Sequence, residues 1–169
     1  MEHQDDLIAG LVAGSAFPVV DEEVESGGLR AESHFFGDAT VEDIVEGNNQ
    51  PIVILDTTVN HWPEVFEYQF EPDVEGHVDD GRFTYLLAGC SCLAGDLFGV
   101  YSFNEPLEIG SRVVFRNAGA YSIVKAHMFN GINLPNIYSL SESGELTLVK
   151  QFTFEDFASR CGVDTRAAV

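Results

Sequence analysis

Three cysteines, Cys90, Cys92 and Cys161, are the side chains of this sequence best suited to proton or metal chemistry. A free thiol has a pKa of about 8.5 and can therefore supply a proton at cellular pH. The set is odd, contains no Cys-x-x-Cys pair and has no histidine at zinc-finger spacing. These features argue against a disulfide framework and against a zinc site. We therefore expect reduced thiols and no bound metal.

The charge balance excludes two classes of partner. The chain has 8 basic and 28 acidic residues, a formal net charge of -20, which would repel nucleic acid and anionic membrane surfaces. Self-repulsion of this size destabilises a compact fold in dilute buffer, whereas at about 1 M salt the Debye length falls to roughly 3 Å. We expect a halophilic source with a salt-adapted cytosol; the alternative is an acidic protein from an ordinary cell.

Length and composition indicate one domain, because 169 residues with 45% hydrophobic content suffice for one ordinary core. The aromatic residues are mostly phenylalanine, and glycines and β-branched residues punctuate the middle of the chain, which favours an all-β or α+β class. The first thirty residues lack a basic leader, and no apolar run approaches the roughly 18 residues of a membrane span. We expect a soluble cytoplasmic protein.

The elements that must position these side chains are mainly strands. Runs of β-formers bounded by turn residues predict several short strands, which together suggest a sandwich or a barrel. A hairpin is predicted between Leu140 and residues 146–151, with Gly144 in its turn. The other predicted strands are residues 51–55, 83–87, 112–115 and 121–129.

Helices are expected only at the two ends of the chain. Residues 5–13 have acids at the front and an amphipathic pattern, which predicts a short helix ending at Gly14. Residues 20–32 are acidic and aperiodic, which predicts a loop. Near the other end, Thr153 precedes an acid by three residues and opens a capped helix that Gly162 stops.

Several multi-residue blocks carry a family resemblance. Cys-Leu-Ala-Gly-Asp at residues 92–96, Tyr-Ser-Phe-Asn-Glu-Pro-Leu at 101–107 and Phe-Asn-Gly-Ile-Asn-Leu-Pro at 129–135 follow one another in order. These blocks resemble those of the carboxynorspermidine decarboxylases. Upstream, residues 41–68 resemble the family segment in which a strand ends in Ile-Leu-Asp, and residues 152–160 resemble its terminal helix. The resemblance covers about residues 40–161 and is specific, because the blocks keep their separations.

The resemblance implies a mainly β fold. The expected domain is a β-barrel or Greek-key-like sheet with short peripheral helices, similar to the C-terminal domain of alanine racemase-like decarboxylases, over residues 39–169. Residues 1–38 form a poorly matched N-terminal segment. Family enzymes also carry a (β/α)8 barrel with the lysine that binds pyridoxal phosphate, and such a barrel needs about 200 residues or more. No such barrel fits in this chain. The two lysines, Lys125 and Lys150, lie in no matching motif.

The resemblance assigns the cysteine motif to the reaction. Cys92 matches the family cysteine that reaches the cofactor of the partner subunit and helps to protonate the carbanion left by decarboxylation; the alternative is a small buried hydrophobe. Cys90 replaces the usual proline and is expected to be structural. Asp96 is predicted either to meet a substrate amine or to hold a backbone turn. Leu93 stands where ornithine-specific enzymes have an acid, and Glu67 is predicted to supply an acid instead.

Other matched residues are assigned to the cofactor and the mouth of the site. Tyr121 matches the tyrosine that hydrogen-bonds the cofactor phosphate, with Gly119 allowing close approach; the alternative is an ordinary strand aromatic. Phe129 and Asn130 match a block that lines the active-site mouth, although Phe129 is also compatible with a core position. His61 matches a histidine near the subunit interface, with a surface histidine as the alternative.

Two functions from different classes follow. In the first, the chain is one half of a pyridoxal-phosphate-dependent decarboxylase of polyamine biosynthesis, which releases CO2 from carboxynorspermidine or carboxyspermidine once a separate barrel chain supplies the lysine. In the second, it is a non-catalytic β domain that binds or regulates a full-length decarboxylase paralogue, or a truncated gene product. A homodimer is compatible with either function. In neither is the chain active alone.

Overall fold

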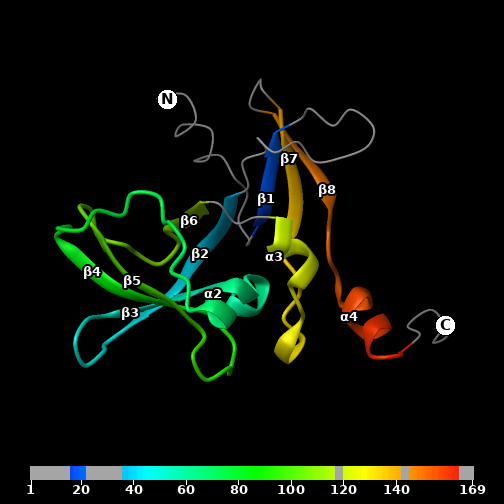
Figure 1. The fold of residues 1–169 in the computed structure, drawn as a ribbon, viewed down its shortest axis with the longest axis horizontal. Coiled ribbons are helices and arrows are strands. Elements are labelled where there is room, and N and C mark those ends of the chain that lie inside the picture. Colours follow the sequence, from blue (N-terminus) through cyan, green and yellow to red (C-terminus); the bar gives the residue numbers. More distant parts are fainter. Residues whose placement is uncertain (1–15, 22–35, 117–119, 142–144, 164–169) are drawn as a thin grey trace.

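The computed structural model describes residues 16–21, 36–116, 120–141 and 145–163, and these fold mainly into strands (Figure 1). The strands are β1 Ala16–Asp21, β2 Phe36–Val45, β3 Ile52–Leu55, β4 Phe83–Ala88, β5 Leu97–Phe103, β6 Arg112–Arg116, β7 Asn136–Leu140 and β8 Leu146–Lys150. The helices are the 3-10 turns η1 Val59–His61 and η2 Phe129–Gly131 and the α-helices α2 Pro63–Tyr68, α3 Ala120–Lys125 and α4 Phe154–Arg160.

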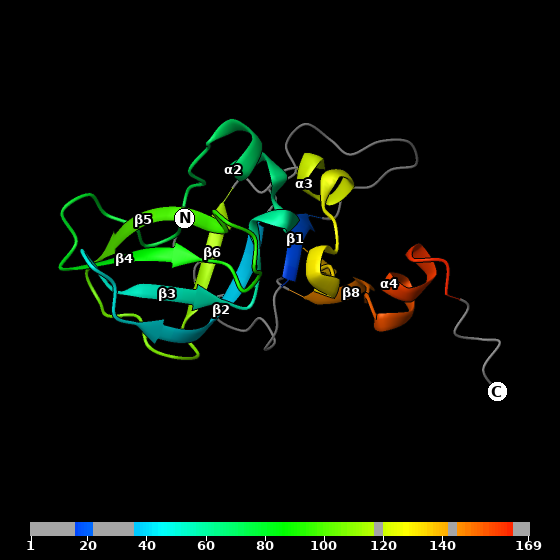
Figure 2. The same cartoon turned by 90° about the horizontal axis from the view of Figure 1, so that it is seen from below.

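Strand β2 connects the two parts of the curled sheet (Figures 1 and 2). Its first half pairs antiparallel with β6, from Phe36 opposite Arg116 to Thr40 opposite Arg112. Its second half pairs antiparallel with β3. The strand order is β5-β4-β3-β2-β1-β7-β8, with β6 beside β2, and the pairs β3/β4 and β1/β7 are parallel. The mainly β class with few helices is confirmed; closure of the sheet into a barrel stays a prediction.

The core lies inside the part of the sheet formed by β2 to β6. Trp62, between η1 and α2, packs edge-on against Phe98 at 5.7 Å between ring centroids, and Phe98 lies 4.7 Å from Phe115. Gly37 on β2 leaves room for the indole, because a Cβ there would lie 2.2 Å from Trp62 Cζ2. Burying rings of this size is a principal source of stability in a domain with few helices. The cluster also anchors η1 and α2 to the sheet.

Several predicted elements are confirmed. Strands β3, β4 and β6 occupy the predicted ranges, and β7 pairs antiparallel with β8 as the predicted hairpin. Helix α4 begins at a complete capping box between Thr153 and Asp156, and it ends before Gly162, which has a φ of 79°. The predicted helix at residues 5–13 and the turn glycine Gly144 lie outside the described residues.

Two sequence predictions are wrong. Residues 121–129 are not a strand: α3 and η2 occupy this range, with Ser122 and Ala126 buried at helical spacing. The loop predicted for residues 20–32 is wrong at residues 20 and 21, which belong to β1 and pair with β7; residues 22–32 lie outside the described residues. The division of the chain at residue 38, which lies within β2, stays a prediction. The sequence analysis did not identify β2, β5 or α2.

None of the helices in the described part of the chain has the length and apolar character that a membrane span requires.

Candidate functional site

The segment Gly89–Asp96, called here the cysteine loop, connects β4 to β5 and contains Cys92. Asp96 at its end is 5% exposed. Its carboxylate accepts hydrogen bonds from the backbone N–H of Val59 at 2.8 Å, the backbone N–H of Ser91 at 2.9 Å and the Ser91 hydroxyl. The carboxylate thus joins both ends of the loop to η1. This geometry favours the turn-holding role that the sequence left open for Asp96.

Ser91 connects the loop to the residues before η1. The Thr58 hydroxyl donates to Ser91 Oγ at 3.3 Å, and Asn60 Nδ2 lies 3.4 Å from the same oxygen. Asn60 Nδ2 also donates to Thr58 Oγ1 at 2.8 Å. These side chains are short and buried or half-buried, so the network fixes the loop at low entropic cost.

Cys92 is exposed, and its backbone is held from a distant part of the chain. The N–H of Cys92 donates to Oδ1 of Asn130 at 3.0 Å. Asn130, within η2, has φ 59° and ψ 11°, a left-handed conformation that asparagine adopts more readily than most residues. The buried hydrophobe proposed as the alternative role of Cys92 is therefore wrong. Cys90 is also exposed as a residue, but partial burial of its thiol, then the nearby Asp96 carboxylate, raises the pKa of that group.

The segment with α3 and η2 reaches this position through a backbone contact with η1. The N–H of His127 donates to the carbonyl of Asn60 at 3.1 Å. Phe129, at the start of η2, is 40% exposed and so is not a core residue. Asn60 therefore contacts both the cysteine loop and the segment that follows α3. Its side chain lies beside Ser91 of the loop, and its carbonyl accepts from His127.

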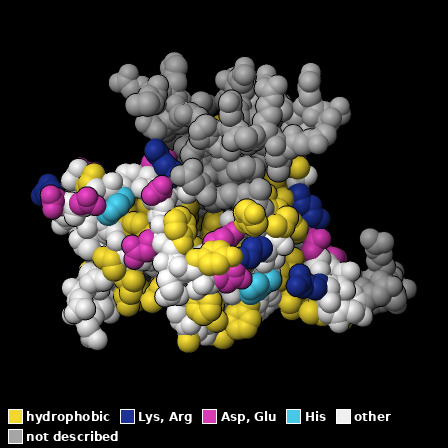
Figure 3. Space-filling view, viewed as in Figure 1, with side chains coloured by type: hydrophobic (Ala, Val, Ile, Leu, Met, Phe, Trp, Pro, Cys, Tyr) yellow, Lys and Arg dark blue, Asp and Glu magenta, His cyan; other side chains and the backbone are white. Residues whose placement is uncertain are grey.

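Tyr121 lies near the start of α3 and is 74% exposed. Its hydroxyl is accessible for a contact with another molecule, although from a helix and not from the predicted strand. Gly119, its predicted companion, lies outside the described residues. The adjoining side chains Phe66, Tyr68 and Val124 are also exposed, and Figure 3 shows hydrophobic side chains gathered on the face that carries α2 and α3 in Figure 1.

Glu67 on α2 forms an ion pair with Lys125 at the end of α3. The Lys125 ammonium also lies 5.0 Å from the centre of the Tyr68 ring. The hydrogen bond to Glu67 raises the pKa of Lys125. The ammonium group that Glu67 binds in this structure is therefore that of Lys125, a residue of the same chain. The second lysine, Lys150, pairs with Asp156 at 3.2 Å.

His61, the last residue of η1, is fully buried, so the surface position considered for it is wrong. Its Nδ1 lies 3.0 Å from the Thr57 hydroxyl. Burial, and to a smaller extent the neighbouring His127, lowers the pKa of His61 from 6.5 to about 3, against an opposing hydrogen bond with the backbone of Asn133. The imidazole is therefore neutral at cellular pH and has a structural environment.

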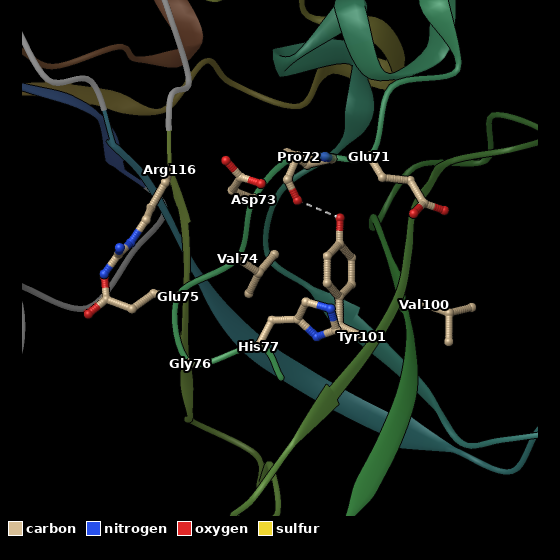
Figure 4. Close-up of a pocket in the computed structure, with 10 residues that line it drawn as sticks. All are labelled: Glu71, Pro72, Asp73, Val74, Glu75, Gly76, His77, Val100, Tyr101 and Arg116. Carbon is tan, nitrogen blue, oxygen red and sulfur yellow. Dashed lines mark hydrogen bonds and ion pairs between the residues drawn. The ribbon is translucent and has the colours of Figure 1, made fainter. Parts of the chain in front are cut away.

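A hollow of about 460 Å³ is lined by none of these residues (Figure 4). The Tyr101 hydroxyl lies inside it and donates to the carbonyl of Pro72 at 2.7 Å. Burial, then the carboxylates of Glu71 and Asp73, raises the pKa of Tyr101. The lining residues are Glu71, Pro72, Asp73, Val74, Glu75, Gly76, His77, Val100, Tyr101 and Arg116. None was predicted as a site residue, although the acids at every second position from residue 71 were visible in the sequence.

The structure brings together some of the predicted residues. Cys92 and Asn130 are in direct contact, and Asp96 lies beneath the same loop. Glu67 and Tyr121 lie on the neighbouring helices α2 and α3, which contact each other. The sequence analysis missed Ser91, Thr58 and Asn60. The only local signal for them was the run of small polar residues after the Ile-Leu-Asp strand end.

Comparisons with known proteins identify relatives of the chain. No protein-family model matches the chain. It is 39% identical over 127 residues to carboxyaminopropylagmatine decarboxylase from Synechocystis sp., covering 73% of this chain and 33% of the relative. It is 36% identical over 136 residues to carboxynorspermidine/carboxyspermidine decarboxylase from Campylobacter jejuni, covering 72% and 35%. The chain thus spans about a third of the length of these relatives.

Solved structures give the same fold. The crystal structure of carboxynorspermidine decarboxylase from Campylobacter jejuni, complexed with norspermidine, matches with a TM-score of 0.70 and 36% identity, over 75% of this chain and 38% of that one. Diaminopimelate decarboxylase from M. jannaschii matches with a TM-score of 0.64 and 20% identity, over 80% and 31%; at this identity the match concerns the fold alone.

Proposed function

From the relationship of this chain to the carboxynorspermidine/carboxyspermidine decarboxylases, over 72% of its length and with the fold of their C-terminal β domain, we propose that it supplies half of a decarboxylase active site. The other half is a barrel chain that carries the cofactor lysine. The reaction is the loss of CO2 from a carboxylated polyamine in polyamine biosynthesis. The whole assembly, and not this chain, is the active enzyme.

The observation that carries the proposal is the presentation of Cys92. Its side chain is exposed, whereas its backbone is fixed by Asn130 and by the network around Asp96. A thiol held this way is placed to give a proton to a carbon atom bound in a second chain, since proton transfer requires a donor at hydrogen-bonding distance. Tyr121 and Phe129, both exposed, lie on the same segment as Asn130, whose side chain binds the backbone of Cys92.

The residues of this chain fit the phosphate-binding part of a pyridoxal phosphate site but not the part that attaches the cofactor to a lysine. Tyr121 offers an accessible hydroxyl for a phosphate oxygen. Neither lysine suits covalent attachment, because Lys125 and Lys150 are ion-paired with Glu67 and Asp156, and a protonated amine is not a nucleophile. When bound, the cofactor supplies the electron sink for the loss of CO2. We propose that a barrel partner supplies the lysine.

The substrates in the relatives' names share a chemistry: a carboxylate on a chain with several amino or guanidino groups. We propose carboxynorspermidine or carboxyspermidine for this chain, as the sequence resemblance first suggested. Glu67 and Phe129 are the proposed substrate contacts on this side.

The test is reconstitution. The purified chain is mixed with a lysine-bearing barrel chain and pyridoxal phosphate, and CO2 release is measured from carboxynorspermidine and from carboxyspermidine. We expect release only when both chains are present and a strong reduction when the chain carries Cys92→Ser. Full release from the barrel chain alone, or from the mixture with Cys92→Ser, would contradict the proposal.

A second function, regulation of a full-length decarboxylase, is favoured by the lack of a lysine suited to the cofactor. In that case the chain would bind the complete enzyme and change its rate, and Cys92→Ser would change it by the same amount. Size-exclusion chromatography of the mixture, and of the chain alone, separates a complex with the enzyme from a homodimer.

A further inference from the structure

We infer that Asp96, for which the sequence also allowed a substrate contact, and Asn130, expected at the active-site mouth, are positioning residues that hold the backbone of Cys92 from two sides. Asp96 binds the residue before Cys92, and Asn130 binds the N–H of Cys92 itself. The inference rests on the proposed role of Cys92, because it says how that thiol is kept in place.

The Asp96 side of this arrangement leaves no room for a substrate amine. Both carboxylate oxygens accept hydrogen bonds from the protein: Oδ1 from Val59, and Oδ2 from the backbone and hydroxyl of Ser91. Gly89 packs directly against the group, since a Cβ there would lie 2.3 Å from Asp96 Oδ1. A carboxylate that is 5% exposed and bonded at both oxygens serves the loop.

The Asn130 side fixes the next peptide. The Oδ1 atom that accepts from Cys92 belongs to a residue with φ 59°, a conformation that glycine, asparagine and aspartate tolerate and most other residues do not. Asparagine therefore meets two demands at once, a left-handed backbone and a short acceptor. The same segment is tied to η1 by His127, so both anchors of Cys92 converge on η1.

The consequence is a fixed direction for the Cys92 side chain. The peptides on either side of a Cα determine where its Cβ points. Here the Cys92 N–H is held by Asn130, and the Leu93 N–H is held at 3.3 Å by Ser91 Oγ, which itself binds Asp96. A thiol that must serve a cofactor in another chain gains from this, because proton transfer is sensitive to small changes in position. Loss of either anchor is expected to increase the motion of the loop without removing the thiol.

Asn130 offers a matched pair of variants. Asn130→Gly keeps the left-handed backbone and removes the acceptor, whereas Asn130→Asp keeps both. Amide hydrogen exchange of Cys92 in the full chain is the readout. We expect exchange about tenfold faster in Asn130→Gly, the size of one hydrogen bond, and near wild type in Asn130→Asp. Equal exchange at Cys92 in all three proteins would overturn the inference.

Thiol reactivity gives a second readout for Asp96. In a background with Cys90→Ser and Cys161→Ser, iodoacetamide alkylates Cys92 alone, and its rate is measured at one pH. We expect faster alkylation in Asp96→Asn, because asparagine has one acceptor oxygen in place of two, so Val59 or Ser91 loses its bond and the loop loosens. Glu105→Gln, an equal change of charge on an exposed loop, is expected to leave the rate unchanged. Equal rates for Asp96→Asn and wild type would contradict the role of Asp96.

These measurements need no partner chain, so they fail independently of the proposed function. If Asn130→Gly frees the Cys92 amide but Cys92→Ser does not reduce CO2 release in the reconstituted enzyme, the positioning stands and the decarboxylase role fails. If exchange of the Cys92 amide is unchanged in Asn130→Gly while Cys92→Ser reduces CO2 release, the decarboxylase role stands and the positioning inference fails. In the reconstituted enzyme, Asn130→Gly is expected to lower kcat more than it raises KM, and Asn130→Asp to restore kcat.

Discussion

The backbone N–H of Cys92 and Oδ1 of Asn130 are 3.0 Å apart, although 38 residues separate them in the chain. The bond joins the cysteine loop to η2 beside an exposed thiol. Two motifs that the sequence shows as separate blocks are thus parts of one surface. This arrangement gives the predictions below a common structural basis.

Replacing Cys92 tests the proposed chemistry directly. In the reconstituted enzyme, Cys92→Ser is expected to lower the rate of CO2 release by about a hundredfold or more, the usual contribution of a positioned proton donor. Cys90→Ser is the matched control, because Cys90 is also exposed but two residues away. Similar losses in the two variants would show that the loop, and not the Cys92 thiol, matters.

Gly89→Ala tests the packing beneath the cysteine loop. The new methyl group would meet the Asp96 carboxylate, so we expect Asp96 to move and the loop to lose its bonds to Val59 and Ser91. Overpacking at a buried site costs about 1–3 kcal/mol, measurable as a lower midpoint of urea unfolding. Faster amide exchange confined to residues 90–96 would identify the cause. An unchanged midpoint and unchanged exchange would be inconsistent with this packing.

Glu67 and Lys125 allow a test of substrate binding on the α2 side. If Glu67 meets a substrate ammonium, Glu67→Gln raises KM in the reconstituted enzyme, whereas Lys125→Gln lowers it, because the competing ammonium is gone. The KM of each variant for carboxynorspermidine is the measurement. Equal KM values for wild type and both variants would remove Glu67 from the proposed site and leave it as a partner of Lys125.

His61 predicts a loss of stability in acid. The pKa of His61 is about 3 in the folded chain and 6.5 when unperturbed. Between pH 6.5 and 3, the imidazole is therefore protonated in the unfolded chain and neutral in the folded chain. Stability contributed by the neutral imidazole is therefore lost as the pH falls from 6.5 toward 3, by roughly 1 kcal/mol in the first unit. Urea unfolding at pH 7.5 and 5.5 measures it, and His61→Gln should have the smaller pH dependence. Equal pH dependence in the two proteins would argue against a neutral His61.

The acidic composition predicts a salt-dependent fold. With a net charge of -20, the melting temperature is expected to rise between low and molar potassium chloride, because screening weakens the repulsion among carboxylates. Thermal unfolding over this range is the measurement. A melting temperature that stays constant or falls would remove the halophilic interpretation.

Local patterns predicted the elements that depend on local chemistry. The strands β3, β4 and β6, the β7–β8 hairpin and the cap of α4 follow from β-branched runs, turn residues and the Thr153–Asp156 capping box. The strand predicted for residues 121–129 was wrong, because alternating polar and apolar residues over so short a stretch also fit a helix that buries Ser122 and Ala126.

The sequence by itself determined the family, the mainly β class, the net charge and the absence of a lysine in a matching motif. These depend on residue identity and on spacing along the chain. Only the tertiary structure decided that Asp96 is buried and bonded within the loop, that Glu67 holds Lys125, and that Asn130 reaches Cys92. The physical reason is that the Val59–Asp96, Glu67–Lys125 and Cys92–Asn130 contacts each join residues more than 30 positions apart. The sequence does not distinguish a carboxylate or amide that binds a substrate from one that forms hydrogen bonds with the protein's own backbone.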